Sequence, residues 1–189
     1  MQSKTSKFII FIVGLVVIFI GIGLATNKAQ APGKYDDFAK ALKDSGAQFY
    51  GAFWCPHCQA QKAQFGSSKQ YLPYVECSNP DNSQTKICAD NKIESFPTWS
   101  FKDGITVTSE EEPVVCSVQP GVDGELDICK NINSEYFKTW LFKEHQFSIK
   151  SPTAPVKTGK VWKFPSTARI TGEVPLEFLA EMIHYTLPK

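Results

Sequence analysis

The chain has 189 residues, enough for one folded domain of about 100 to 200 residues together with shorter appended segments. Hydrophobic residues make up 42% of it, and 14 residues are phenylalanine, so the chain can build a substantial core. The formal net charge of +1 argues against a basic surface built to bind nucleic acid.

The segment at residues 1–25 differs in composition from the rest. Lys4 and Lys7 precede an uncharged stretch at residues 8–25 that is rich in Ile, Val and Phe. As a helix this stretch would span roughly 27 Å, close to the thickness of the hydrocarbon layer of a bilayer. We therefore expect one N-terminal transmembrane helix, an anchor that leaves the rest of the chain outside the cytoplasm. The alternative is a secretory signal cleaved near residues 29–31 (A-Q-A), which also exports the domain.

Residues 26–33 indicate a short linker, and a folded domain is expected at residues 34–189. Its first part alternates helix-forming and strand-forming stretches. The predicted helices are residues 34–45, 58–71 (with Phe65 and Tyr71 facing inward) and 85–91, and the predicted strands are residues 48–54, 74–77 and 98–101.

Residues 105–159 break this alternation with prolines, scattered aromatic residues and one helical stretch near residues 134–144, which indicates an insertion. Strands are expected again at residues 161–164 and 169–172, followed by an amphipathic helix at residues 174–187. Strands that alternate with helices predict an α/β layer fold.

The six cysteines form three pairs along the sequence, and none lies in the apolar N-terminal stretch. An even number in an exported domain favours disulfides, although spacing alone leaves their connectivity open. The pairs are Cys55 and Cys58, Cys77 and Cys88, and Cys116 and Cys129.

The first pair belongs to the motif Cys55-Pro56-His57-Cys58, which lies between a predicted strand and a predicted helix. A cysteine at a helix N-terminus has a lowered pKa, because free N–H groups and the helix dipole favour its thiolate. The thiolate is the attacking species in disulfide exchange, and Cys58, one turn further on, can resolve the mixed disulfide. His57 can stabilise the same anion, which favours an oxidising pair.

Other uses of this motif are less favoured. A zinc site needs four ligands, and the wide spacing of Cys77 and Cys88 makes no second knuckle. Covalent haem attachment needs C-x-x-C-H, but Gln59 follows Cys58. A purely structural disulfide across two residues would be strained and labile. We therefore expect redox chemistry with no metal and no resident cofactor.

Pro97 stands just before a predicted strand, about 40 residues after the motif. It can simply start that strand, since most X–Pro bonds are trans. A cis proline opposite a C-x-x-C would instead expose the backbone of Phe96 to an extended client peptide. The spacing favours this second interpretation, with Phe96 and Trp54 contacting the client.

Several stretches resemble the thioredoxin-like domain associated with bacterial vitamin K epoxide reductase homologues. They are residues 50–59 (YGAFWCPHCQ), 65–66 (FG), 74–77 (YVEC), 82–84 (NSQ), Cys88 and 96–99 (FPTW). The tetrapeptide C-P-H-C also occurs in DsbA-like oxidases, but the extended pattern is more specific. The resemblance covers about residues 34–101 and 161–187.

The resemblance implies a thioredoxin fold, a central mixed sheet flanked by helices, with Cys55 attacking, Cys58 resolving and Pro97 in cis. It also implies a structural disulfide between Cys77 and Cys88. The clients would be reduced exported proteins, and a quinone-linked membrane protein similar to vitamin K epoxide reductase would accept the electrons.

The chain departs from that family in three respects. It has one predicted membrane span, so the quinone-linked partner must be a separate polypeptide. Phe49 stands where related proteins carry a buried acid, so another group or water must handle the proton of Cys58. Residues 105–159 have no recognised counterpart.

A disulfide between Cys116 and Cys129 would close a loop of about a dozen residues and contribute roughly 3 kcal/mol at best. The insertion that carries this disulfide is either a structural addition with no role in binding or a surface that selects a partner.

The sequence thus predicts a single-pass membrane protein whose extracytoplasmic thioredoxin-fold domain oxidises cysteines of other proteins. A disulfide reductase or isomerase is the alternative within the same chemistry, because the reduction potential sets the direction. The alternative without redox chemistry is a non-catalytic binding module, either a metal carrier or a domain held together by disulfides.

Overall fold

The structure is a computed structural model that describes residues 32–116, 129, 137–142 and 144–189. The predicted anchor at residues 1–25 lies outside the described residues and stays a prediction. Among the residues that are described, no helix is long and apolar enough to cross a membrane. Gly33–Lys189 form one compact unit.

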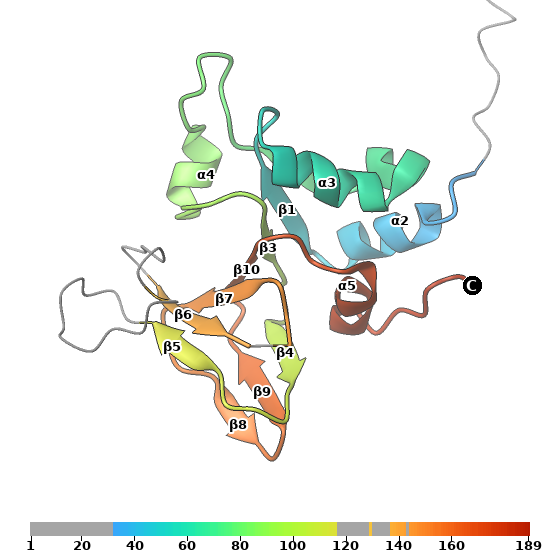
Figure 1. The fold of residues 1–189 in the computed structure, drawn as a ribbon. Helices are drawn as coiled ribbons and strands as arrows, with labels where there is room; N and C mark the ends of the chain where they lie inside the picture. The colour runs from blue at the N-terminus through green and yellow to red at the C-terminus, as the bar shows by residue number, and fades with distance from the viewer. Residues whose placement is uncertain (1–31, 117–128, 130–136, 143) are drawn as a thin grey trace, which may run out of the picture. The chain divides into compact units, whose positions relative to one another are not determined.

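The first part of this unit follows the expected alternation of helices and strands (Figure 1). The elements are α2 (Asp36–Asp44), β1 (Gln48–Gly51), α3 (Pro56–Gln64), the 3₁₀ helix η1 (Gly66–Tyr71), β2 (Tyr74–Glu76), α4 (Lys86–Asp90) and β3 (Thr98–Ser100). Strand β1 ends earlier than predicted, so Phe53 and Trp54 lie in the loop after it and are exposed.

The central sheet has seven strands in the order β2-β1-β3-β10-β7-β6-β5. The pair β1 and β2 is parallel and the other pairs are antiparallel, so the sheet is mixed. Its remaining strands are β5 (Val114–Cys116), β6 (Lys138–Leu141), β7 (Ser148–Ser151) and β10 (Arg169–Thr171). A mixed α/β architecture is therefore confirmed, and the sheet is consistent with a thioredoxin-like fold.

Three strands of the predicted insertion, β5, β6 and β7, continue this central sheet. One row of paired residues crosses all seven strands and is apolar or aromatic throughout. The row is Tyr74, Phe49, Trp99, Ile170, Ile149, Trp140 and Val115. The strands of the insertion thus extend the same apolar row that begins beside the C-x-x-C motif.

A second sheet contains β4 (Ile105–Thr108), β9 (Val161–Phe164) and β8 (Val156–Thr158), in that order. The predicted strand at residues 161–164 is confirmed as a strand, and it belongs to this second sheet rather than to the central one. Alternate residues of β4 and β9 are buried, so each strand has one face against the core and pairs with the other instead.

Other expectations fail because local pattern was outweighed by tertiary context. The helical stretch near residues 134–144 is wrong over its described part, where Lys138–Leu141 form β6 and pair with β7. Thr139 and Trp140 suit a half-buried strand. The helix predicted to run to Tyr71 ends at Gln64 and gives way to η1, at whose start Gly66 has a φ of 56°. Tyr71 is consequently 36% exposed rather than inward-facing.

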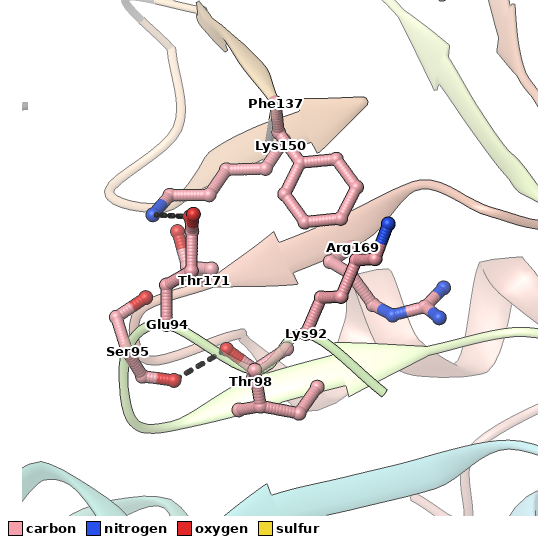
Figure 2. A pocket seen from close by; sticks show the side chains of 9 residues that line it. Lys92, Glu94, Ser95, Thr98, Phe137, Lys150, Arg169 and Thr171 are labelled. Carbon is pink, nitrogen blue, oxygen red and sulfur yellow. Dashed lines mark hydrogen bonds and ion pairs between the residues drawn. The ribbon is translucent and has the colours of Figure 1, made fainter. Parts of the chain in front are cut away.

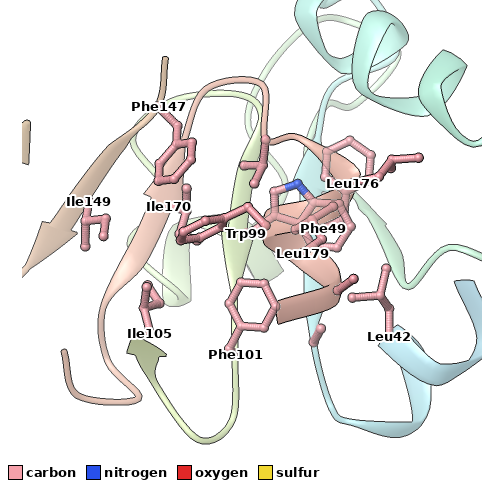
Figure 3. Close-up of a cluster of buried hydrophobic side chains, with 14 of the residues drawn as sticks. Leu42, Phe49, Trp99, Phe101, Ile105, Phe147, Ile149, Ile170, Leu176 and Leu179 are labelled. Atoms are coloured by element: carbon pink, nitrogen blue, oxygen red, sulfur yellow. The ribbon is translucent and has the colours of Figure 1, made fainter. Parts of the chain in front are cut away.

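The last helix, α5 (Leu176–Met182), is shorter than the predicted residues 174–187, and His184 beyond it has a φ of 54°. Its buried face packs on the sheet with Leu176 and Leu179 close to Phe49 and Trp99 (Figure 3). The rings of Phe49 and Trp99 stack with centroids 4.7 Å apart. This core fixes β1, and hence the point at which the chain leaves the sheet for α3.

Candidate active site

Cys55 is the N-cap residue of α3, and this places its sulfur at the helix N-terminus. Its backbone is extended, with φ −79° and ψ 117°, and its Sγ accepts a hydrogen bond from the Cys58 amide at 3.3 Å. Pro56 occupies the first turn, where a missing N–H has no cost. The order Cys-Pro therefore produces both the helix start and an anion-favouring position for the sulfur.

The two thiols are free and differ in their environment. Cys55 is 4% exposed and Cys58 is fully buried. Burial, and then the hydrogen bond with Cys55, raise the pKa of Cys58 from 9.0 to about 12. Cys58 therefore keeps its proton at neutral pH, and Cys55 is the outer sulfur of the pair.

The loop before β3 lies against Cys55. The Phe96–Pro97 peptide bond is cis, and the Cys55 thiol donates to the Phe96 carbonyl oxygen over 3.8 Å. The Pro97 carbonyl oxygen accepts from the Gly172 amide at 3.1 Å, which ties this loop to the end of β10. Residues separated by about 40 positions in the sequence are thus adjacent in the structure.

Aromatic side chains surround this junction. Trp54 is 50% exposed, and its ring meets that of Phe96 edge-on with centroids 6.1 Å apart. The Trp54 indole Nε1 donates to Ser78 Oγ at 2.8 Å, which holds the exposed ring in place. Phe53 is exposed on the same loop. The surface beside the Cys55 sulfur is therefore apolar and preorganised.

His57 contacts a residue that the sequence did not single out. Its Nδ1 lies 2.7 Å from Glu173 Oε1. Gln61 holds this acidic segment in place, because its side chain donates to the Val174 carbonyl oxygen at 2.9 Å and accepts from the Val174 amide at 2.7 Å. Gln61 is completely buried. No sequence signal pointed to this contact, because the burial of Gln61, and hence its need for polar partners, is seen only in the fold.

The predicted insertion braces the loop that carries Pro97. Lys150 of β7 and Glu94 form an ion pair of 3.1 Å between Nζ and Oε2, and the two side chains are only 9% and 16% exposed. They border a cavity of about 10 Å³ that Arg169 and Thr171 also line (Figure 2). The Thr98 hydroxyl donates to the Ser95 carbonyl oxygen at 2.7 Å and further orders the loop.

The other four cysteines form two disulfides. Cys77–Cys88 joins the end of β2 to α4, and Cys116–Cys129 lies at β5. Strands β2 and β5 are the opposite edges of the central sheet, so the two bonds staple different ends of the domain. Among the described residues, no group of three or more His, Cys, Asp or Glu side chains is placed to hold a metal ion.

No protein-family model matches the chain. It is 51% identical over 73 residues to the thiol-disulfide oxidoreductase LTO1 of Arabidopsis thaliana. The match covers 35% of this chain and 19% of that relative, so the chain matches about a fifth of the length of the plant protein. The likeness supports an oxidoreductase enzyme.

Proposed function

We propose that the chain is a thiol-disulfide oxidoreductase that oxidises cysteines of exported proteins through Cys55 and Cys58. The observation that carries the proposal is the position of the Cys55 sulfur, at the N-cap of α3 and against the Phe96 carbonyl oxygen. Disulfide exchange needs an attackable sulfur at a position that favours an anion and a nearby resolving thiol, and the positions of Cys55 and Cys58 support these two roles.

The reaction begins with the pair in its disulfide form. A client thiolate attacks Cys55 Sγ, a client–Cys55 bond forms, and the Cys55–Cys58 bond breaks, so that Cys58 leaves as a thiolate and takes up a proton. A second client thiolate then attacks the client sulfur of the mixed disulfide. The client gains a disulfide, Cys55 leaves as a thiolate stabilised at the helix N-terminus, and two electrons have passed to the pair.

The client binds as an extended peptide beside Phe96 and Trp54. The Phe96–Pro97 segment presents backbone to an added strand, and the exposed rings supply apolar contact. Contact through backbone and aromatic surface accepts many sequences, which suits an enzyme with varied clients.

The reduced pair passes its electrons to a quinone-linked membrane partner similar to vitamin K epoxide reductase. The domain is held outside the cytoplasm by residues 1–25. Its two structural disulfides support this location, because such bonds persist in oxidising compartments.

Two measurements test the proposal. The reduction potential of the Cys55–Cys58 pair, measured by equilibration with glutathione, is expected to be about −120 mV, the value of a strong oxidant. A value of about −270 mV would identify a reductase. The Cys58→Ser variant is expected to accumulate a mixed disulfide with a disulfide-containing model client, and Cys55→Ser is the matched control that should form none. Equal trapping by both variants would contradict the assigned roles.

A further inference from the structure

A cluster of charged and aromatic side chains lies beside Cys58. Cys58 and Lys62 are one turn apart on α3, so their side chains share a face of the helix. Lys62 Nζ lies 3.3 Å from the centroid of the Tyr74 ring on β2. The helix that carries the cysteines therefore also carries an ammonium group directed at the adjacent strand.

Gly51 shows that Tyr74 and Cys58 meet at one point. A Cβ atom at Gly51 would lie 2.9 Å from Tyr74 Cε2 and 3.0 Å from Cys58 Sγ. The Tyr74 ring and the Cys58 sulfur therefore both lie against Gly51, and the Lys62 ammonium group lies over that ring. The glycine leaves space for this contact between the strand and the buried sulfur.

Glu76 completes the cluster. Its Oε2 accepts from the Tyr74 hydroxyl at 2.9 Å, and its Oε1 accepts from the amides of Phe53 and Ser78 at 3.1 and 3.0 Å. Three donors thus fix the carboxylate beside the loop that leads to Cys55. Burial lowers the pKa of Lys62, and the charge of Glu76 partly offsets this by favouring the protonated form.

We propose that Lys62 exchanges the proton of Cys58 during disulfide exchange, in place of the buried acid whose position Phe49 occupies. The inference rests on the proposed function. When Cys58 leaves Cys55 as a thiolate, the Lys62 ammonium group transfers a proton to Cys58 Sγ and becomes a neutral amine. In the reverse step the amine takes the proton back as Cys58 attacks Cys55, so charge and atoms balance in both directions.

The surroundings of Lys62 suit it to proton exchange better than the surroundings of Tyr74 suit the tyrosine. Burial lowers the pKa of Lys62 below its usual 10.5, and the positive charge of Lys62 partly opposes the rise in the pKa of Cys58 that burial causes. Burial and the bond to Glu76 raise the pKa of Tyr74, so its hydroxyl keeps its proton. The charged or titratable groups that act on Lys62 are Glu76, Cys58, Lys69 and Cys55.

The test separates the two chemical steps. Reduced protein is mixed rapidly with oxidised glutathione, quenched with acid at intervals, and weighed by mass spectrometry. The first step joins glutathione to Cys55, and the second closes the Cys55–Cys58 bond and releases it. The variants are Lys62→Met, which removes the exchanging group, and Lys62→Arg, which keeps the charge but holds its proton at any working pH. Lys40→Met is the control, since Lys40 also lies over a tyrosine ring, at 4.7 Å from Tyr71.

We expect both Lys62 variants to form the mixed disulfide at the wild-type rate but to resolve it about a hundredfold more slowly, as loss of a general acid-base group does. In Lys62→Met the second rate should also rise steadily with pH, because only hydroxide then deprotonates Cys58. Lys40→Met should match the wild type.

Resolution at the wild-type rate in either Lys62 variant would overturn the proton exchange. Failure of disulfide exchange at Cys55 looks different: the first step would then be absent from the wild type and from every variant alike, whereas a reductase would be recognised by the lower reduction potential of its cysteine pair.

Discussion

His57 Nδ1 and Glu173 Oε1 lie 2.7 Å apart, although 116 positions separate them in the sequence. The contact joins the centre of the C-P-H-C motif to the segment just before α5. Gln61, one turn further along α3, clamps the same segment through both backbone groups of Val174. The motif helix is therefore attached to the C-terminal part of the domain at two consecutive turns.

Replacing Glu173 by alanine should raise the reduction potential of the Cys55–Cys58 pair. Glu173 occupies Nδ1 of His57 and brings a negative charge toward the helix N-terminus. Without it, the imidazole is free to stabilise the thiolate of the reduced form, and a tenfold effect corresponds to about 30 mV. Equilibration with glutathione measures the change, and Glu177→Ala is the control on the adjacent helix. An unchanged or lower potential would show that the contact does not restrain His57.

Gln61→Leu should destabilise the domain. The substitution keeps the size of the side chain but leaves the amide and the carbonyl of Val174 without their partner in a buried site. Each orphaned group costs about 1–3 kcal/mol. Denaturant unfolding measures the loss, and Gln59→Leu is the matched control, because the bond of Gln59 to the Phe53 carbonyl oxygen is exposed. Equal stability of the two variants would contradict a structural role for the Gln61 clamp.

The parts of the molecule that follow local pattern were predictable from sequence. The strand-helix alternation around Cys55 depends on short apolar stretches and helix-forming residues, and the structure reproduces it. The central sheet beyond β10 was not predictable, because its strands β5, β6 and β7 have only three or four residues each, too few for a clear local pattern. Thr139 and Trp140 have no local signal strong enough to exclude a helix.

The residues of the candidate site also differ in how far the sequence predicts them. Cys55 and Cys58 can be identified from their motif, and Phe49 stands out because it replaces the buried acid of the proteins that the sequence resembles. Glu173 and Lys62 have no such sequence signal, because a lone acid or a lone lysine is ordinarily a solvated residue. Only the fold shows that Glu173 meets His57 and that Lys62 lies over Tyr74.

Lys150→Met should destabilise the domain more than an ordinary surface substitution. The change removes the ammonium group that faces the Glu94 carboxylate at 3.1 Å, from a lysine that is 7% exposed. Such a pair is worth more than the roughly 0–1 kcal/mol of a solvent-exposed ion pair, whereas replacing both members of a buried pair is often close to neutral. The double variant Glu94→Gln with Lys150→Met should therefore recover most of the stability in denaturant unfolding. Additive losses in the two single variants and the double variant would contradict the pairing.

The reduction potential of the Cys55–Cys58 pair should fall as the pH rises, and the slope should show whether Cys58 is protonated. Burial and the bond to Cys55 raise the pKa of Cys58 to about 12, so reduction of the disulfide takes up a proton at Cys58 throughout the neutral and mildly alkaline range. One proton for two electrons gives a slope of about −30 mV per pH unit wherever Cys55 is ionised, and about −60 mV where both thiols are protonated. Raising the pH disfavours reduction, because the proton that reduction consumes becomes scarcer.

The distinguishing range lies above pH 9.0, the ordinary pKa of a cysteine thiol. Above that pH, a Cys58 thiol that is buried and stays protonated keeps the slope of potential against pH at about −30 mV per pH unit. A thiol that ionised at its ordinary pKa would instead reduce the slope to zero. Potentials from equilibration with glutathione at pH values on both sides of 9.0 measure the slope. A flat line above that pH would mean that Cys58 ionises freely and needs no proton-exchanging neighbour.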